Sequence, residues 1–375
     1  MKIKALLILL GVFAVFSACV QKSHKRVTEE MILSHVFLHQ DTAILGYPIL
    51  ESEGVMFLSV PRSSPAYEFC CLKGDSLNKV GTFGNIGNGP YEFERPYFFL
   101  SADNKCLYIF TWNYRKLFRI PQPWEKNVYQ PDKWEKIAFP EDADFFAVGN
   151  SNMGHLLNDS TLLAIGGEIV HHVTEDVDGE NFLSLIHFGH SVEPVQGLSY
   201  PDSGRVDIPV NVKRMVYSEI ALLRQFASDR FALVGKRGNY FILFDLKGNK
   251  AYNVNVVLDE YPRYTLAPDG INAQFSKEQG EGYRAQSTSR YIYLLESPFE
   301  TTNEWMHAED YKGFPSGFRD KIQVYDWDGN YVKTYRLDIP VEAFMVTEDD
   351  SYIYGYTWDK ESGEEKIAKF ELPKL

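Results

Sequence analysis

The sequence predicts an all-β fold, namely a six-bladed β-propeller of four-stranded antiparallel blades that spans residues 31–375. Three observations support this fold. Aromatic residues make up 15% of the chain, a composition that favours strands over helices. A polar turn followed by a short apolar strand recurs six times, and two of the copies continue into clear hairpins.

The recurring unit is a polar turn that precedes a few apolar, aromatic or β-branched residues. Equivalent positions in successive units, from Val55 to Tyr352, are separated by 52 to 69 residues. Strands repeated at this spacing are typical of blades arranged around a ring, because radial closure leaves only short sheet edges. The six predicted strands are Val55–Leu58, Cys106–Phe110, Thr161–Ile165, Phe231–Val234, Tyr291–Leu295 and Tyr352–Tyr354.

Two units show a further hairpin clearly. The strand Tyr240–Asp245 runs into a turn with Gly248, and the strand Lys321–Asp326 runs into a turn with Gly329. Glycine supplies the positive backbone angle that a tight hairpin requires, and an alternating strand follows each turn. Each unit is therefore expected to contain several antiparallel strands.

The two ends of the predicted propeller are expected to meet in one blade. Val36–Gln40 and Thr42–Ile49 precede the first complete unit, so one of them should complete the last blade. Its neighbour there would be the strand Ile367–Leu372.

The N-terminal residues carry a targeting pattern. Lys2 and Lys4 precede the apolar run Ala5–Phe16, and small residues then lead to Cys19. This arrangement resembles a bacterial lipoprotein signal, which implies a signal peptide over 1–18, lipidation of Cys19 and a flexible tether over 19–30. A plain secretory peptide and an uncleaved anchor helix are the alternatives, although a membrane span needs roughly 20 apolar residues.

The net charge and the residues after Cys19 help to predict where in the cell the protein is located. The formal net charge is -13, which argues against binding to nucleic acid or to anionic lipid through charge. Val20–Ser23 contains no acidic run of the kind that resembles a surface-export signal. We therefore expect a lipid-anchored protein of the cell envelope, on the outer membrane and facing the periplasm.

Three cysteines follow Cys19, an odd number for an oxidising compartment. Cys70 and Cys71 are neighbours and would point to opposite faces of a strand, so at most one could pair with Cys106. Buried free thiols are the favoured interpretation, and one disulfide is the alternative.

A glycine-rich segment, Gly81–Phe93, resembles the signature loop of bacterial TolB-like six-bladed propeller lipoproteins. The matching residues are Gly87, Gly89, Pro90, Glu92 and Phe93, whereas Tyr91 stands where the family usually has glycine. The resemblance implies the six-bladed fold and no particular activity. The loop is interpreted as a structural turn in which Glu92 accepts backbone hydrogen bonds; the alternative is a rim loop in which Glu92 meets a ligand.

The sequence offers weak support for a metal or catalytic site. Five histidines gather in the third unit: His155, His171, His172, His187 and His190. His171 and His172 would point to opposite faces of a strand, which disfavours a shared metal. Asp176–Glu180 resembles the start of a calcium loop, but its twelfth position is His187 rather than glutamate. No cofactor is therefore predicted, although calcium in the channel remains the alternative.

Extended loops on one face are the predicted binding surface. The polar segment Phe275–Gln286, with Tyr283 and Arg284, and a later segment with Trp305 carry residue types that often dominate binding energy. We expect a non-catalytic scaffold that binds an envelope protein, a peptide or a glycan. The alternative is a channel-centred, lactonase-like hydrolase, possibly dependent on calcium; the signatures of α/β-hydrolases and zinc peptidases are missing from the sequence.

Overall fold

The computed structural model describes most of the propeller. The described residues are 30–40, 46–60, 63–93, 96–100, 105–111, 116–125, 127–138, 143–145, 154–168, 182–202, 204–226, 228–276, 282–297, 314 and 317–374. The predictions for the signal peptide, for Cys19 and for Trp305 lie outside these residues, as do those for His171, His172 and Asp176–Glu180. Among the described helices, none is long and apolar enough to cross a membrane.

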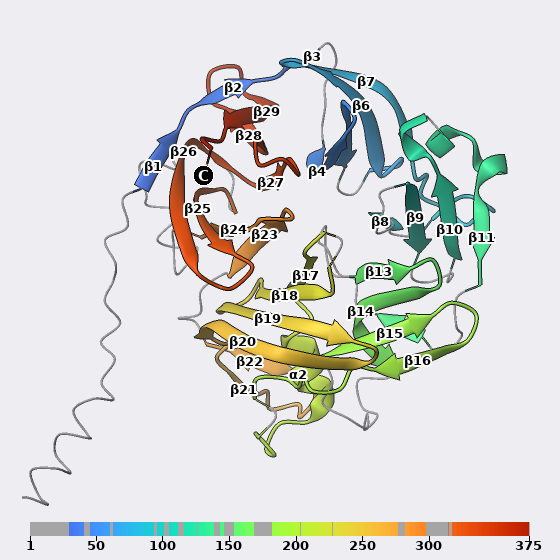
Figure 1. Cartoon of the computed structure of the whole chain (residues 1–375), viewed down its shortest axis with the longest axis vertical. Helices are drawn as coiled ribbons and strands as arrows, with labels where there is room; N and C mark the ends of the chain where they lie inside the picture. The colour runs from blue at the N-terminus through green and yellow to red at the C-terminus, as the bar shows by residue number, and fades with distance from the viewer. Residues whose placement is uncertain are drawn as a thin grey trace, which may run out of the picture.

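Six antiparallel sheets surround a central axis, so the predicted six-bladed propeller is confirmed (Figure 1). From the axis outward, blade I contains β4 (Tyr47–Ser52), β5 (Val55–Ser59), β6 (Tyr67–Lys73) and β7 (Ser76–Phe83). Blade II contains β8 (Pro96–Leu100), β9 (Cys106–Thr111), β10 (Lys116–Pro121) and β11 (Glu135–Ile137). Blade III contains β13 (Gly154–Asn158), β14 (Thr161–Glu168), β15 (Leu183–His187) and β16 (Ser191–Pro194), and β12 (Ala143–Phe145) pairs with β14.

The remaining blades follow the same order. Blade IV contains β17 (Ile220–Arg224), β18 (Arg230–Gly235), β19 (Asn239–Lys247) and β20 (Lys250–Glu260). Blade V contains β23 (Tyr283–Ser287), β24 (Tyr291–Glu296), β25 (Arg319–Asp326) and β26 (Tyr331–Val341). Blade VI contains β27 (Ala343–Val346), β28 (Tyr352–Asp359) and β29 (Glu364–Glu371).

The six strands predicted from the repeat are all present, but each is the second strand of its blade rather than the first. In each blade another strand precedes it and faces the channel. The expected hairpin turns are also present, with φ of +59° at Gly248 and +85° at Gly329.

The N-terminal residues form a strap that runs along the outer edges of three blades (Figure 1). β1 (Glu30–Leu33) pairs in parallel with β26 of blade V, and β3 (His39–Gln40) pairs in parallel with β7 of blade I. Between them, β2 (His35–Phe37) pairs antiparallel with β29 and supplies the fourth strand of blade VI. The expected closure of the last blade by an N-terminal strand is therefore confirmed.

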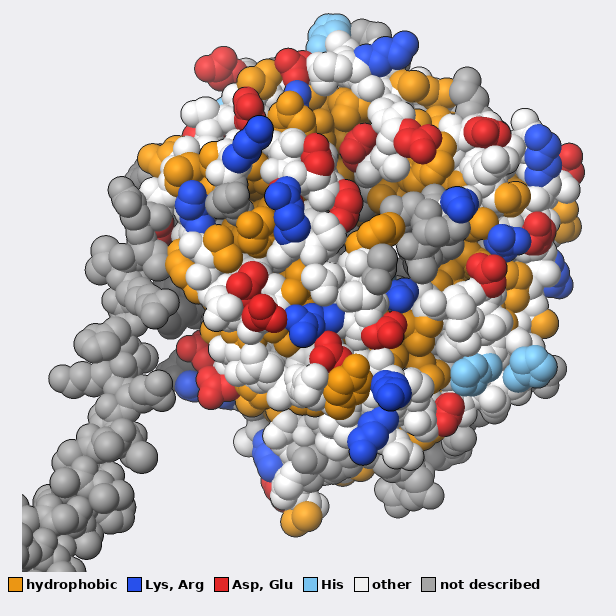
Figure 2. All heavy atoms as spheres, viewed as in Figure 1, with side chains coloured by type: hydrophobic (Ala, Val, Ile, Leu, Met, Phe, Trp, Pro, Cys, Tyr) orange, Lys and Arg blue, Asp and Glu red, His pale blue; other side chains and the backbone are white. Residues whose placement is uncertain are grey.

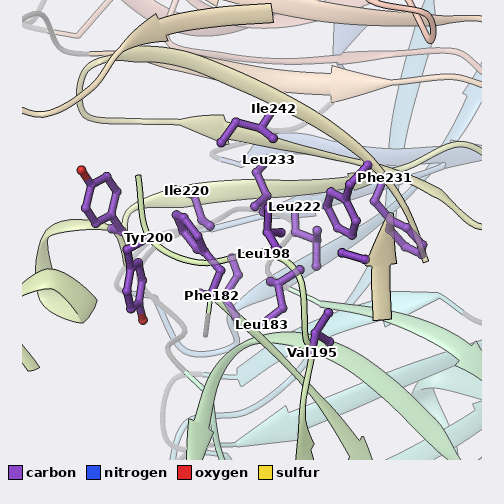
Figure 3. Packing of buried hydrophobic residues seen from close by; sticks show 14 of the residues in the cluster. Phe182, Leu183, Val195, Leu198, Tyr200, Ile220, Leu222, Phe231, Leu233 and Ile242 are labelled. Carbon is purple, nitrogen blue, oxygen red and sulfur yellow. The ribbon is translucent and has the colours of Figure 1, made fainter. Parts of the chain in front are cut away.

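The core consists of six clusters of buried side chains among the described residues, one at each interface between neighbouring blades. Figure 3 shows the cluster between blades III and IV, where Leu183 and Val195 face Leu222 and Leu233. The second strands are buried on both faces because each blade packs between two others; all of β5, for example, is buried.

The long step between the third and fourth units reflects an insertion that the repeat does not predict. This insertion contains a short helix, α2 (Val210–Val216). The hairpin of β21 (Tyr264–Leu266) and β22 (Ala273–Phe275), which follows β20 in the chain, lies with α2 outside blade IV (Figure 1). Tyr200, Tyr217 and Tyr264 join this layer to the cluster between blades III and IV. Three single-turn 3-10 helices, Pro123–Glu125, Asn127–Tyr129 and Pro131–Lys133, connect β10 and β11.

The three described cysteines are free thiols. Cys70 lies in the cluster between blades VI and I, and Cys106 lies in the cluster between blades II and III, so the two belong to different interfaces. Burial raises the pKa of the Cys70 thiol to about 12, which keeps it protonated and unreactive.

Candidate functional site: the channel cavity

A cavity of about 290 Å³ lies where the inner strands of four blades meet. Seen along the ring axis, the middle of this face is hollowed, and basic side chains lie beside acidic ones around it (Figure 2). The lining residues are Tyr47, Pro48 and Ile49 of β4, Ala221 of β17, Lys236 after β18, Arg284, Ala285 and Gln286 of β23, Glu342 before β27, and Ala343 and Phe344 of β27.

Small side chains leave this space open. Ala221, Ala285 and Ala343 line it from the inner strands of blades IV, V and VI. Inner strands converge on the axis of a propeller, so larger residues at these positions would fill the channel. The cavity is therefore open because alanine stands at three positions that are far apart in the sequence.

Arg284 is held in the cavity by the start of β23. The buried guanidinium of Arg319 donates to the carbonyl oxygens of Gly282 (2.8 Å) and Leu295 (3.2 Å) and so fixes this end of the strand. Gly282 has a φ of +67°, and a side chain there would overlap the backbone of Lys236, which brings blades IV and V close together. The Arg284 guanidinium then lies 3.8 Å from the carboxylate of Glu342.

Glu342 is the acidic residue among the described residues that line the cavity. Two other lining residues interact with its carboxylate. The Tyr47 hydroxyl interacts electrostatically with the Glu342 carboxylate, and the Arg284 guanidinium pairs with that carboxylate. Burial raises the pKa of Tyr47 and the nearby carboxylate adds to the effect, so this phenol stays protonated as a donor.

Lys236 supplies a second cation, from the turn between β18 and β19. Burial lowers the pKa of its ammonium group to about 8, an effect that Glu219 opposes and Arg284 reinforces. Glu219 is itself paired with Arg237 at 2.9 Å. Lys236 therefore faces the cavity as an ammonium group whose charge is poorly compensated.

The side chains that line the cavity are of the kinds that bind a ligand. It offers two cationic groups, a tyrosine hydroxyl and the Gln286 amide beside apolar walls, which is the usual composition of a site that orients a small polar ligand. The described residues contain no group of three histidine, cysteine or carboxylate side chains that could hold a metal ion.

Of the residues predicted to bind, Arg284 lies in this cavity. Tyr283 does not line the cavity. Its ring is only 4% exposed and packs between blades IV and V, and burial raises its pKa. The expectation that Tyr283 lies in an exposed loop is therefore wrong.

The glycine-rich loop lies between β7 and β8, and its contacts fit the structural interpretation. The Gly89 amide donates to the Glu92 carboxylate at 2.8 Å, and a side chain at Gly87 would overlap that carboxylate. Phe93 is fully buried in the cluster between blades I and II. Pro90 lies in the turn that brings Glu92 back toward Gly89, where the Gly89 carbonyl accepts a hydrogen bond from the Glu92 amide at 3.1 Å.

The described histidines of blade III make separate contacts. His155 Nε2 hydrogen-bonds the carbonyl oxygen of Leu222 at 2.8 Å, and His187 lies 3.5 Å from Glu193 and 3.3 Å from the hydroxyl of Thr161. These contacts give His155 and His187 structural roles, whereas His190 lies exposed in the turn between β15 and β16.

Sequence reasoning missed Tyr47, Lys236 and Glu342. A usable signal existed only for Lys236, which lies in the run Gly235–Gly238, a turn in which two basic residues stand between two glycines. Tyr47 and Glu342 are nearly 300 positions apart, and only closure of the ring brings them together.

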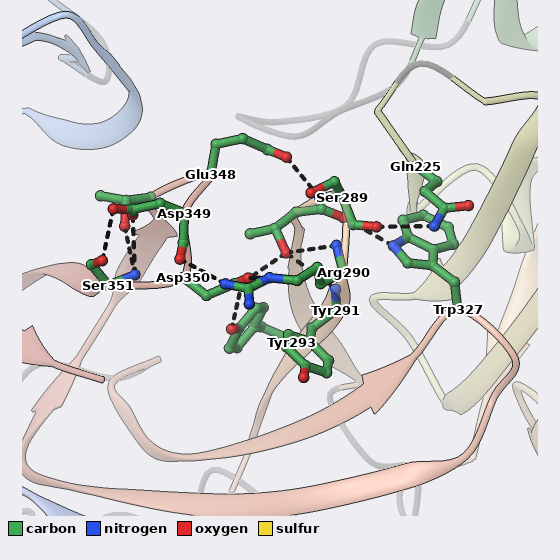
Figure 4. A network of polar contacts seen from close by, with 12 residues as sticks. Gln225, Ser289, Arg290, Tyr291, Tyr293, Trp327, Glu348, Asp349, Asp350 and Ser351 are labelled. Atoms are coloured by element: carbon green, nitrogen blue, oxygen red, sulfur yellow. Dashed lines mark hydrogen bonds and ion pairs between the residues drawn. The ribbon is translucent and has the colours of Figure 1, made fainter. Parts of the chain in front are cut away.

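A second, larger cavity of about 410 Å³ lies between blades V and VI, beside Arg290 and Asp350. Figure 4 shows the polar network there, in which Thr288 Oγ1, Tyr293 OH and Arg290 Nε all donate to the Asp350 carboxylate at 2.7 Å. Because these groups satisfy one another, we assign this network a structural role in joining the two blades.

Comparison with known proteins supports the fold. Residues 173–349 match the family model described as "TolB-like 6-blade propeller-like". A solved member of the DUF4221 family from Bacteroides vulgatus superposes with a TM-score of 0.52 and 11% identity, over 93% of this chain and 98% of that one. A candidate exported protein from Bacteroides fragilis gives 0.51 and 12%, over 94% and 98%. No curated protein matches the sequence.

The family match begins after the glycine-rich loop and covers β15 and β16 of blade III, blades IV and V, and β27 of blade VI, so it is independent of the residues that first suggested the resemblance. The two solved structures extend the likeness in fold to nearly the whole chain. The resemblance is therefore confirmed: residues 173–349 are similar to the TolB-like propeller family, and the chain has the six-bladed fold.

Proposed function

We propose that this protein is a non-catalytic binding propeller of the bacterial cell envelope whose ligand site is the channel cavity. The partner is an envelope protein, a peptide or a glycan that presents a small polar group to the cavity. The observation that carries this proposal is the convergence of Arg284, Lys236 and Glu342 from three blades on one open space. Ligand binding explains why polar side chains gather around a channel that no side chain fills.

The proposed location rests on the N-terminal pattern. Cys19 would carry lipid, and the following residues would tether the propeller to the outer membrane on its periplasmic side. A fold shared with a candidate exported protein is compatible with this location.

The hydrolase alternative has less support. Glu342 is the carboxylate in the described lining, and Tyr47 and Arg284 engage it. A calcium-dependent hydrolase would need several carboxylates around its ion.

The test is affinity purification of the full chain from its native envelope, followed by mass spectrometry. The comparison variants are Cys19→Ala, to remove the lipid site, and Ala285→Leu, to fill the cavity. We expect a stoichiometric partner with the wild-type chain, release of the chain from membranes with Cys19→Ala, and loss of the partner with Ala285→Leu at an unchanged melting temperature. A partner retained by a folded Ala285→Leu variant would contradict the proposed site.

A further inference from the structure

The charge of the cavity is opposite in sign to that of the protein. The whole chain has a formal net charge of -13, yet the described lining holds two cations, Lys236 and Arg284, against one carboxylate, Glu342. Next to the lining, Glu219 and Arg237 compensate each other as an ion pair. Among the described residues, a local excess of one positive charge is therefore left inside a polyanion, and it attracts an anion into the channel.

The two cations are not satisfied equally. Glu342 lies close to Arg284 but is not paired with Lys236. Within the described part of the chain, no carboxylate lies within 4 Å of the Lys236 ammonium group, and no hydrogen bond to it is formed. A half-buried and poorly compensated cation is costly, so the site is completed when a ligand brings a negative charge.

The size of the cavity limits the ligand. A volume of about 290 Å³ is at the lower end for small-molecule pockets. It suits a single sugar or the terminal residue of a peptide rather than an extended polymer. One excess positive charge is neutralised by a monoanion, and the nearby Glu342 carboxylate disfavours a dianion such as phosphate.

We infer that the cavity binds a carboxylate group of the ligand against Arg284 and Lys236, an inference that rests on the proposed function. Arginine presents two parallel N–H groups that match a carboxylate, and lysine adds a point charge. The carboxylate belongs either to a sugar acid or to a peptide C-terminus, which share this chemistry.

The test uses isothermal titration calorimetry on the full chain in a zwitterionic detergent. The probes are glucuronate with glucose as its neutral counterpart, and N-acetyl-glycylglycine with its C-terminal amide. We expect one of the two acids to bind at least roughly tenfold more tightly than its neutral counterpart, and the acid that binds identifies the source. Failure of both acids to bind at about 10 mM overturns the inference.

Variants separate a direct contact from a structural role. Lys236→Gln and Arg284→Gln should each weaken binding of the acid by roughly tenfold, whereas Glu342→Gln should tighten it severalfold by removing the competing carboxylate. Lys250→Gln makes the same change of charge on the outer strand of blade IV and should leave the affinity unchanged. Equal affinities in all four variants would overturn the inference.

The affinity should also depend on pH. The charged groups that face Lys236 are Glu219 before β17 and Arg284 on β23, with Glu342 and Tyr47 across the cavity. Because the Lys236 ammonium group has a pKa of about 8, the affinity should fall as pH rises above that value. The Lys236→Gln variant should lose this dependence, and a wild-type affinity that is flat to about pH 9 would contradict the role of Lys236.

These outcomes are distinguishable from failure of the proposed function. If the envelope partner is lost with Ala285→Leu but the acids bind no better than their neutral counterparts, the cavity remains the binding site and the carboxylate inference is wrong. If the acids bind as expected while the partner survives cavity filling, the partner binds elsewhere.

Discussion

His155 on β13 connects blades III and IV close to the channel. Its Nε2 atom donates to the carbonyl oxygen of Leu222 on β17, and Arg224 returns a hydrogen bond of 2.6 Å to the carbonyl oxygen of Leu156. Burial lowers the pKa of His155 to about 4, with a further contribution from Arg224, although the hydrogen bond to Leu222 opposes the shift. The folded protein therefore holds this imidazole in its neutral form.

The free energy of unfolding should therefore depend on pH through the protonation of His155. In the unfolded chain the histidine pKa is about 6.5, so the unfolded state binds the proton first, and stability is lost as pH falls from there toward 4. Between about pH 7 and pH 5 the loss due to His155 should be on the order of 2 kcal/mol. Urea unfolding at both pH values measures it, and a His155→Gln variant should lack this part of the decrease. An identical decrease in both proteins would contradict the assignment.

Single residues of the cavity were only partly predictable from sequence. Arg284 stands in a polar segment before a strand, and that context was enough to make it a binding candidate. Its neighbour Tyr283 was misplaced because a long polar interruption looks like a loop until strand alternation is known. Glu342 and Tyr47 have no local signature, since their proximity depends on how blade VI meets blade I.

At the scale of elements, the strand repeat was predictable because the turn before each strand is formed by hydrogen bonds between residues close together in the sequence. A hydroxyl at the turn accepts backbone hydrogen bonds before the second strand: Ser228 from Arg230 (3.1 Å), Thr288 from Tyr291 (3.1 Å) and Thr347 from Tyr352 (3.0 Å). The inner strands β13 and β23 escaped detection because polar residues interrupt their apolar pattern. α2 escaped because it has seven residues and no side-chain cap.

The strap formed by β1, β2 and β3 is the element whose contribution to the stability of the fold is most easily tested. His39 is exposed, but its amide donates to the carbonyl oxygen of Asp75 at 2.7 Å. His39→Pro removes this donor and should lower the free energy of unfolding by about 2 kcal/mol more than His39→Ala, which keeps the amide. Urea unfolding of the two variants provides the comparison. Equal midpoints would show that the strap adds nothing to the stability of blade I.

At the scale of the whole molecule, blades are joined by polar contacts as well as by packing. Arg230 of blade IV pairs with Asp328 of blade V at 2.8 Å, and Arg290 of blade V pairs with Asp350 of blade VI at 2.7 Å. The side chain of Asp328 is 73% exposed, whereas that of Asp350 is 5% exposed and also accepts from Thr288 and Tyr293. The second contact should therefore contribute far more to holding the ring together.

Matched substitutions test this difference. Asp350→Asn keeps the size of the side chain and suits the φ of +56° at this position, but it removes the charge that three donors require. We expect it to cost about 2 kcal/mol and Asp328→Asn to cost less than about 0.5 kcal/mol. Thermal unfolding followed by circular dichroism measures both, and similar melting temperatures for the two variants would contradict the expectation.

The position of β2 determines when the ring can close during synthesis. β2 is among the first strands of the described chain to leave the ribosome, yet its partner β29 is the last. Blades I to V can form as their strands appear, but blade VI has an open edge until β29 is available. Closure of the propeller therefore has to wait until β29 has been synthesised, and before that the chain is a ring with one gap whose exposed edge needs protection from other chains.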